Sequence, residues 1–466
     1  MGEQLIVEGG VLVNGSSMEP RDLLIEDGRI AAIGRPGAFR GLECARLDAA
    51  QRYILPGAID AHVHSRDPGF PMKEDITSLT EGALKGGVTT FLEMPNTIPP
   101  VHDAETFRSK TQSYVGRSYT DYGLWGLILG DLNRSELERL ASEGVVGFKL
   151  FWGYALDPHT YELVYNPSPG QEVIQPFDEA EILAAFGEVA RLNRPFAVHT
   201  ESKAIVDRRT RENDRGLGPS DPYQELLYSR PPIAEAHLIR TAASIAQEVR
   251  GHLHIVHLSS SSGVEAVKES RRLGVRVTVE TCPHYLTLSA EDYARIGPIM
   301  KCYPPIRTSD HRQALWQALL DGEIDTIGSD HAPHTVEEKI GPLRNIPAGF
   351  PGVELMLPLM LEHVAAGRLS LSKVVQLTAE NPAKLFGIDH RKGFLKPGMD
   401  ADLCLVSLDH TWEVKDSLLA SKSKATPYNG MMLRGKVTAT VLRGSVVMMD
   451  GKVLGTPSGR MVQPQD

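Results

Sequence analysis

The sequence predicts an α/β fold: a (β/α)8 TIM barrel with a small β-sandwich domain built from both chain ends. Three observations predict it. Short apolar runs alternate with segments of helical period along the middle of the chain, polar residues stand at the ends of those runs, and hairpin signals occupy both termini. A chain of 466 residues, 41% of them hydrophobic, can bury a core of that size.

The two ends of the chain predict antiparallel sheet. Residues 23–34 form two β-rich runs around an Asp-Gly turn, and residues 438–455 repeat the pattern around an Arg-Gly and an Asp-Gly turn. Neither end has enough apolar strand to be stable alone. We therefore expect 1–54 and 389–466 to associate as one β-sandwich, with the barrel, 55–388, inserted between them.

Eight apolar runs occupy the middle of the chain, each followed by a loop or a helical segment. Eight is the strand count of a (β/α)8 barrel, although a doubly wound sheet also alternates in this way. The position of the polar residues favours the barrel, because its active site is built at the C-terminal ends of the strands. The runs are 58–64, 88–96, 122–129, 145–151, 196–202, 252–260, 276–282 and 324–330. The polar residues near their ends are His62, His64, Asn96, Lys149, His199, His257 and Asp330.

The side chains gathered at this rim suit a metal ion. Imidazole nitrogens combined with oxygen donors favour Zn²⁺ or a similar first-row ion. His62 and His64 lie on the same face of a strand, because side chains alternate with period two. A single strand-end histidine is more often a structural residue, but that explanation must hold repeatedly here, and unpaired buried imidazoles are costly. Coordination is the more economical interpretation.

Lys149 stands inside the apolar run GVVGFKLFW, where burial penalises its ammonium form. In one interpretation the side chain extends to the barrel mouth or pairs with a carboxylate. In the other, the neutral amine reacts with CO₂ to form a carbamate that bridges two metal ions. Residue type alone leaves both interpretations open.

With these motifs the chain resembles the cyclic amidohydrolases of the amidohydrolase superfamily, which include dihydroorotases, allantoinases, hydantoinases and dihydropyrimidinases. The resemblance extends from the N-terminal sheet to NPAKLFGI, 381–388, and GFLKPGMDADLCLV, 393–406. It implies two divalent metal ions, with zinc the expected metal, and a bridging Lys149 carbamylated by CO₂. The ligands that it implies are His62, His64, Lys149, His199, His257 and Asp330.

The resemblance also implies a reaction, the reversible hydrolysis of a small cyclic amide. Two metal ions polarise the ring carbonyl and activate water. Asp330 accepts the proton of the attacking water and passes it to the leaving nitrogen. Because oligomers are common among these enzymes, the resemblance further implies a homo-oligomer, either a dimer or a tetramer.

Three residues favour dihydroorotase, which interconverts dihydroorotate and N-carbamoyl-aspartate in pyrimidine synthesis. The resemblance assigns Arg66 in HVHSR, Asn96 in MPNT and His334 in SDHAPHT to binding the ring carboxylate. A guanidinium can bind a carboxylate through two parallel hydrogen bonds. The alternative for Arg66 is a salt bridge that merely orders its loop, for which the neighbouring acids are Asp67, Glu74 and Asp75.

Other features favour an uncharged ring. Tyr154 stands where hydantoinases and dihydropyrimidinases carry a tyrosine that binds the transition-state oxyanion, although it could instead pack on Trp152. The segments VETCPHYL and KCYPPIR and the insertion 157–179 resemble allantoinases or hydantoinases. Dihydroorotase ranks first, with allantoinase or hydantoinase/dihydropyrimidinase as the alternative. A non-catalytic dihydropyrimidinase-like scaffold is a distant one, because all six ligand positions are filled.

Composition narrows the class of partner. The formal net charge of −10 gives no broad basic surface, so we expect neither nucleic acid nor an anionic membrane to be a partner. The four cysteines include no C-x-x-C pair, which fits a reducing compartment. The N-terminal residues lack the pattern of a signal peptide, and no run reaches the length of a membrane span. A cytoplasmic location is expected.

Overall fold

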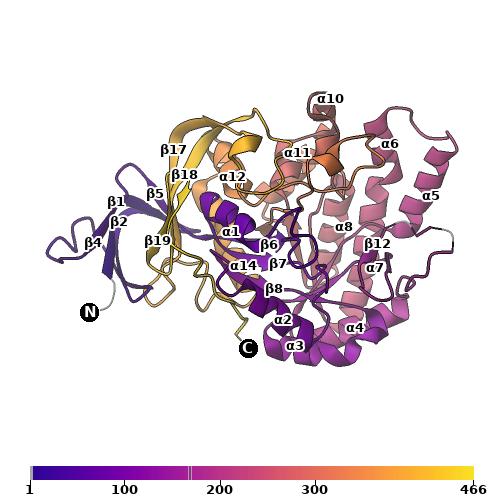
Figure 1. The fold of residues 1–466 in the computed structure, drawn as a ribbon, viewed down its shortest axis with the longest axis horizontal. Helices are drawn as coiled ribbons and strands as arrows, with labels where there is room; N and C mark the ends of the chain where they lie inside the picture. Colours follow the sequence, from indigo (N-terminus) through magenta and orange to yellow (C-terminus); the bar gives the residue numbers. More distant parts are fainter. Residues whose placement is uncertain (1–3, 166, 169, 466) are drawn as a thin grey trace.

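The computed structural model describes residues 4–165, 167–168 and 170–465. It contains a barrel of parallel strands with helices around it and, beside the barrel, a sheet that combines both chain ends (Figure 1). The predicted fold class is therefore confirmed. The barrel strands are β6 (Ala58–Val63), β7 (Val88–Glu93), β8 (Asp121–Leu124), β9 (Gly126–Leu127), β10 (Phe148–Leu150), β13 (Pro195–Val198), β14 (His252–Ile255), β15 (Val277–Thr281) and β16 (Thr326–Ile327).

The strands of the barrel follow chain order. One sheet runs β6-β7-β8, and the other runs β9-β10-β13-β14-β15-β16. Strands β8 and β9 are separated only by Trp125, so they form one interrupted barrel strand. The ring closes where Val63 bridges His331 in parallel and the His64 N–H donates to the His331 carbonyl at 2.8 Å. Closure brings the first and the last strand of the barrel, and the polar residues after each, to one edge.

The smaller sheet joins the two chain ends. In it, β5 lies between β1 and β17, pairing parallel with the first and antiparallel with the second. Apolar residues of both ends share one core cluster that includes Leu23, Ile54 and Leu403. The strands are β1 (Gln4–Val13), β2 (Met18–Glu26), β3 (Arg29–Gly34), β4 (Ala45–Asp48), β5 (Tyr53–Pro56), β17 (Leu403–Glu413), β18 (Met432–Leu442), β19 (Ser445–Met449) and β20 (Lys452–Val453).

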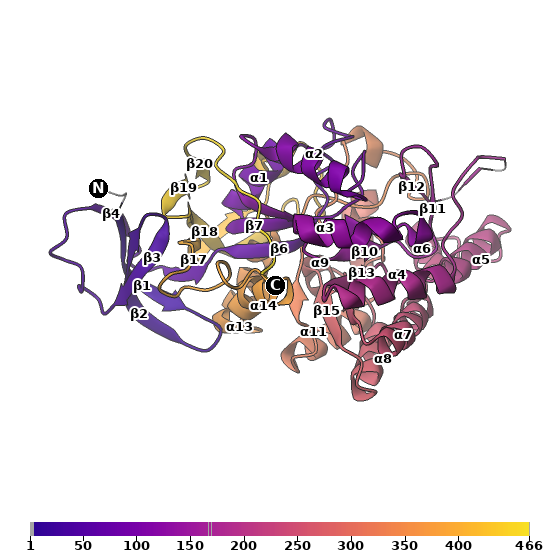
Figure 2. The same cartoon turned by 90° about the horizontal axis from the view of Figure 1, so that it is seen from below.

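Helices cover the outside of the barrel, as the view from below shows (Figure 2). Several begin at an aspartate that accepts a hydrogen bond from the third residue of the helix, as Asp75, Asp103 and Asp178 do. The helices are α1 (Ile76–Lys85), α2 (Ala104–Tyr114), α3 (Leu137–Glu143), α4 (Glu179–Arg191), α5 (Lys203–Asp214), α6 (Pro222–Ser229), α7 (Pro232–Val249), α8 (Ser261–Arg272), α9 (Pro283–Thr287), α10 (Tyr293–Ile296), α11 (Ser309–Leu320), α12 (Met356–Ala365), α13 (Leu371–Val375) and α14 (Asn381–Leu385). Within the described ranges, no helix is long and apolar enough to cross a membrane.

The division into 1–54, 55–388 and 389–466 stays a prediction. Strand β5 of the smaller sheet continues to Pro56, and only Gly57 separates it from the first barrel strand. Near the C-terminus the chain returns to the barrel, where Met461 bridges Tyr122 and Val462 joins a barrel core cluster. The sheet therefore leads directly into β6, which carries His62.

Candidate active site

A cavity of about 80 Å³ opens at the C-terminal ends of the barrel strands. Nine of the ten predicted site residues line it: His62, His64, Arg66, Asn96, Lys149, Tyr154, His199, His257 and Asp330. They come from segments far apart in the chain. His62 and Asp330, which are 268 positions apart, are in contact. The tenth, His334, lies behind Arg66, with its Nε2 3.3 Å from Arg66 Nη2. The rim placement expected of a barrel active site is thus present in the structure.

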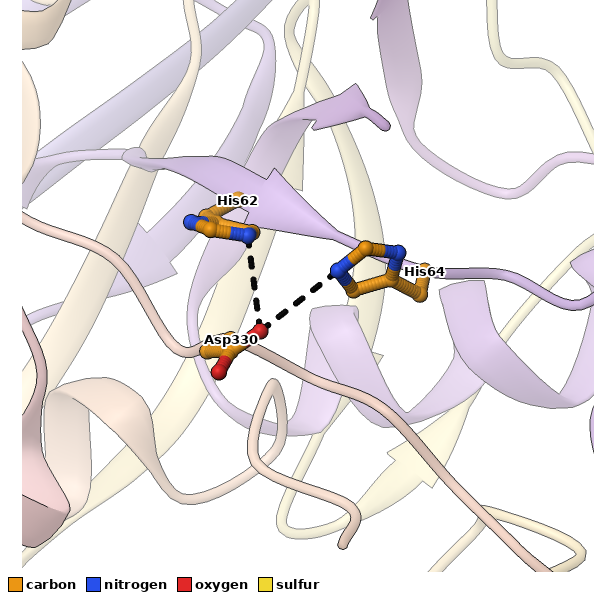
Figure 3. Close-up of side chains that lie close together, drawn as sticks. All are labelled: His62, His64 and Asp330. Atoms are coloured by element: carbon orange, nitrogen blue, oxygen red, sulfur yellow. Dashed lines mark ion pairs between the residues drawn. The ribbon is translucent and has the colours of Figure 1, made fainter. Parts of the chain in front are cut away.

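His62, His64 and Asp330 form a compact group of possible metal donors (Figure 3). Asp330 Oδ1 lies 3.4 Å from His62 Nε2 and 3.5 Å from His64 Nε2. Burial alone would raise the pKa of the Asp330 carboxyl, but the imidazoles around it bring the pKa below its ordinary value. Asp330 is therefore held as a carboxylate.

Each of these histidines is oriented by a partner on its other nitrogen. His62 Nδ1 donates to Glu280 Oε1 at 2.7 Å, and His64 Nδ1 donates to Asn96 Oδ1 at 2.7 Å. Because a carboxylate only accepts, His62 carries its proton on Nδ1 and presents the Nε2 lone pair to the cavity. Partners of this kind fix the tautomer and the ring direction of a metal ligand.

His199 and His257 form a second donor pair. His199 Nδ1 lies 3.0 Å from His257 Nε2, and His199 Nε2 donates to Glu201 Oε2 at 3.0 Å. Burial lowers the pKa of both imidazoles, so both are neutral. The buried Nδ1 of His257 has no hydrogen-bond partner among the described residues.

Lys149 is 1% exposed and lines the same cavity as the two donor groups. No described residue forms a hydrogen bond or an ion pair with its amine, which lies 5.3 Å from the centre of the Phe151 ring. Burial lowers the pKa of the amine to about 7, against the attraction of Glu280 and Asp330. A neutral amine at this position is able to react with CO₂.

The residues fit a pair of divalent ions. Neutral imidazoles and carboxylate oxygens are the ligands that zinc takes in catalytic sites. Two ligands of one tetrahedral zinc, at about 2.0–2.1 Å from it, stand about 3.3 Å apart. The spacings of 3.0 Å between His199 and His257 and of 3.4 Å and 3.5 Å around Asp330 are of this size.

Arg66 faces the cavity without a carboxylate partner among the described residues. Its Nε donates to the Pro333 carbonyl at 3.2 Å. The loop salt bridge offered as the alternative is absent from the described structure, because Asp67 pairs with Arg117 and Asp75 with Lys422 instead. The guanidinium of this half-buried residue therefore retains free donors beside the cavity.

Tyr154 also faces the cavity. Its ring lies 5.7 Å from that of His199 and 5.1 Å from that of Tyr165, whose own ring lines the cavity. Burial raises the pKa of the Tyr154 hydroxyl above its ordinary value, so the phenol is protonated and able to donate. Tyr154 therefore adds a hydrogen-bond donor to the lining of the cavity.

Three of these residues adopt left-handed backbone conformations. The φ angles of Arg66, His257 and Asp330 are 63°, 41° and 48°. Such angles are unfavourable for residues other than glycine and cluster at functional sites, where the surrounding structure enforces them. The backbone is bent at these positions where it leaves, or has just left, a barrel strand.

The sequence reasoning missed several residues of the site. Glu201 and Glu280 orient His199 and His62, and Cys302, Tyr303 and Tyr165 line the cavity. A carboxylate inside an apolar run, as Glu280 is in RVTVETC, was a usable signal. Tyr303 and Tyr165 come from loops, and no pattern in the sequence placed them at the rim.

The fold and the rim cavity define the class of barrel enzymes whose catalytic residues follow the strands. Residues 53–447 match the model of the amidohydrolase family. The chain belongs to the amidohydrolase family.

Comparisons with individual proteins agree with that assignment. The chain is 36% identical over 465 residues to an allantoinase of Rubrobacter xylanophilus, covering 99% of this chain and 98% of the relative. It is 33% identical to an L-hydantoinase of Paenarthrobacter aurescens, covering 97% and 95%. Among solved structures, the L-hydantoinase (dihydropyrimidinase) from Arthrobacter aurescens superposes with a TM-score of 0.91 at 33% identity, over 99% of this chain and 100% of that one.

Proposed function

We propose that this protein hydrolyses the ring amide of an uncharged cyclic ureide, of which allantoin and 5-substituted hydantoins are the candidate substrates. The observation that carries the proposal is full-length similarity to an allantoinase and an L-hydantoinase, at 36% and 33% identity. The sequence ranked dihydroorotase first, and the comparisons support the alternative instead. The motifs shared with dihydroorotase are short, whereas the similarity to these relatives extends along the whole chain.

In this proposal six residues hold two zinc ions: His62, His64, Lys149 as its carbamate, His199, His257 and Asp330. When bound, the metal pair lowers the pKa of a water and polarises the ring carbonyl. Glu280 and Glu201 keep His62 and His199 in the required tautomers through their hydrogen bonds of 2.7 Å and 3.0 Å.

The protein itself moves the proton and stabilises the developing charge. Asp330, held as a carboxylate, accepts the proton of the attacking water and delivers it to the ring nitrogen as the amide bond breaks. Tyr154 donates a hydrogen bond to the oxyanion that forms on the carbonyl oxygen. Tyr303 and Gly349, which come from two different loops, complete the cavity wall.

One observation favours a second candidate, a ring that carries a carboxylate such as dihydroorotate. Arg66 faces the cavity with no acidic partner among the described residues, and His334 lies against it. In that case Arg66→Met should weaken the carboxylate substrate by about 2–5 kcal/mol, because the lost pair is desolvated, and leave hydantoin hydrolysis nearly unchanged.

The test is a parallel hydrolysis assay of zinc-loaded protein, supplied with bicarbonate, on allantoin, 5-benzylhydantoin, dihydrouracil and dihydroorotate. We expect the highest kcat/KM on allantoin or the hydantoin. Preference for dihydroorotate would establish the second candidate. Failure to hydrolyse any of the four would reject the proposed activity and favour a non-catalytic role.

A further inference from the structure

Arg230 is a buried cation at the edge of the site, where the chain leaves α6. It is 6% exposed and follows Ser229, the last residue of that helix. Its backbone is fixed on both sides, because its N–H donates to the Leu226 carbonyl at 3.1 Å and its own carbonyl accepts from Arg307 at 2.8 Å. Its guanidinium carbon lies 3.4 Å from the centre of the Tyr303 ring, which lines the reaction cavity. The side chain is therefore fixed at both ends.

The guanidinium contacts two groups of the site through one nitrogen. Its Nη1 forms an ion pair with the fully buried Glu201 and lies 3.5 Å from the Tyr154 hydroxyl oxygen. Glu201 in turn accepts from His199 Nε2 at 3.0 Å. Arg230 thus contacts Tyr154 directly and His199 through Glu201, and it does not itself line the cavity.

The direction of each hydrogen bond follows from the chemistry of the groups. A guanidinium has donors only, and a carboxylate has acceptors only. Glu201 must therefore accept from both Arg230 and His199, which puts the His199 proton on Nε2 and leaves the Nδ1 lone pair facing His257. The Tyr154 oxygen must likewise accept from Arg230, which leaves its own proton free to be donated elsewhere.

We propose that Arg230 is a positioning residue that fixes the direction of two functional groups, the Nδ1 lone pair of His199 and the hydroxyl proton of Tyr154. The inference deepens the proposed function and rests on it for the role of Tyr154. The contact with the Tyr154 hydroxyl is long, and such contacts tighten when a substrate closes the site. One buried side chain thereby couples metal binding to stabilisation of the oxyanion.

The test compares Arg230→Met with Arg209→Met in the full-length protein. Arg209 is a matched control, because it also pairs with a glutamate, Glu212, and donates to a tyrosine hydroxyl, Tyr228, but on the protein surface. We expect Arg230→Met to weaken Co²⁺ binding by about 10–100-fold in competition with a chelator and to change the visible absorption of the bound Co²⁺. Arg209→Met should leave both unchanged.

Kinetics test the second contact. We expect kcat of Arg230→Met to fall by about 10–100-fold, with KM changed less than about threefold. Tyr154→Phe should cost less in the Arg230→Met background than in the wild type, since the two residues act on one hydroxyl. A folded Arg230→Met protein with wild-type Co²⁺ affinity and the full effect of Tyr154→Phe would overturn the proposal.

Two further measurements separate the role of Arg230 from the proposed hydrolytic activity. If Arg230→Met does not fold, Arg230→Lys carries the test, because lysine retains the charge beside Glu201 but lacks the planar fork. It should keep most of the Co²⁺ affinity and lose at least about fivefold in kcat, and a wild-type kcat would overturn the inference. The Co²⁺ measurement needs no substrate, so it still tests Arg230 if none of the ring compounds is hydrolysed.

Discussion

Asp330 lies beside two possible metal ligands and is also the carboxylate that could accept a proton. Its carboxylate lies 3.4 Å and 3.5 Å from the Nε2 atoms of His62 and His64, and its backbone adopts a φ of 48° three residues after β16. Surrounding imidazoles keep the pKa of the carboxyl low, so it is ready to accept a proton. No other carboxylate among the described residues lines the cavity.

Asp330→Asn should remove the proton acceptor while keeping an oxygen donor in place. We expect the purified variant to retain its metal content, measured by elemental analysis, and to lose about 10²–10⁴-fold in kcat on the preferred ring. An Asn variant with kcat close to that of the wild type would remove Asp330 from the proton transfer.

The sequence located the cavity residues where strand periodicity controls their position. His62, His64, Lys149 and Asp330 follow apolar runs, so the barrel brings them to one rim. The supporting residues could not be found in the same way. Glu201, Arg230 and Tyr303 act through contacts between segments far apart in the chain, and such contacts leave no periodic pattern.

At the scale of elements, the segment 337–349 is held by two buried lysines and ends in Ala348 and Gly349, which line the cavity. Lys301 Nζ donates to the carbonyls of Leu343, Arg344 and Ile346 at 2.7, 3.2 and 2.6 Å. Lys339 Nζ donates to the carbonyls of Pro347 and Gly349 at 3.0 and 2.7 Å. Neither lysine pairs with a carboxylate in the described structure, so both amines serve as hydrogen-bond donors to the backbone of this segment.

Lys301→Met should release the segment without emptying the space, because methionine has a similar length. We expect faster hydrogen exchange across 341–349 and a KM that rises several-fold more than kcat falls, since the wall binds substrate before reaction. Lys268→Met, on the exposed face of α8, is the control. Unchanged exchange in Lys301→Met would show that the segment is held by other contacts.

A second prediction at the scale of elements concerns Glu354. This residue lies just before α12, and its carboxyl joins that segment to the loop at Ala420. Burial raises the pKa of Glu354 from 4.5 to about 7, although the Ala420 N–H donates to it at 2.7 Å. Between these values the folded protein holds a proton that the unfolded chain has lost. The contribution of Glu354 to the free energy of unfolding is therefore highest below pH 4.5, falls as pH rises to about 7 and stays lower above it.

Glu354→Gln should remove this pH dependence while keeping an acceptor for Ala420. Between pH 5 and pH 8 the wild type should lose more free energy of unfolding than the variant does. We expect the difference to be on the order of 1–3 kcal/mol, measured by urea unfolding. Glu248→Gln, on the exposed face of α7, is the control and should have the same free energy of unfolding as the wild type at pH 5 and at pH 8. Parallel curves for Glu354→Gln and the wild type would refute the raised pKa.

The order of the elements was predictable because apolar runs and Gly-containing turns mark the strands. Each barrel strand overlaps an expected run, and β8 and β13 each begin one residue before theirs. The pairing of β5 with both β1 and β17 was not predictable in register, because it depends on how the barrel places the two chain ends. The interruption of the third barrel strand at Trp125 also left no signal.

At the scale of the whole molecule, a buried ionic group joins the smaller sheet to the barrel. Lys392 Nζ lies 2.5 Å from Asp121 on β8 and 2.5 Å from Asp402, which precedes β17. Asp400 contacts it at 3.0 Å, and Arg443 also pairs with Asp121. Burial alone would lower the pKa of Lys392, but the three carboxylates raise it above its ordinary value.

This group lies at the end of the barrel opposite the cavity, because Asp121 is the first residue of β8 and the cavity lies beyond the strand ends. In a barrel enzyme the face at the N-terminal ends of the strands contributes stability, and the face at their C-terminal ends carries catalysis. The ionic group should therefore support the attachment of the sheet without taking part in the reaction.

Lys392→Met separates these two roles. Removing the cation leaves Asp402 without a cationic side chain beside it, although Asp121 and Asp400 keep Arg443 and Arg391. The cost should be about 3–5 kcal/mol, so the urea midpoint should fall clearly. The kcat of the folded protein should change less than about threefold, because the cavity is at the other end of the barrel. Lys415→Met is the matched control, since Lys415 pairs with Glu413 at the surface and should contribute less than about 1 kcal/mol. If kcat of the folded variant fell by much more than about threefold, the sheet would be shown to position β6, and with it His62, during catalysis.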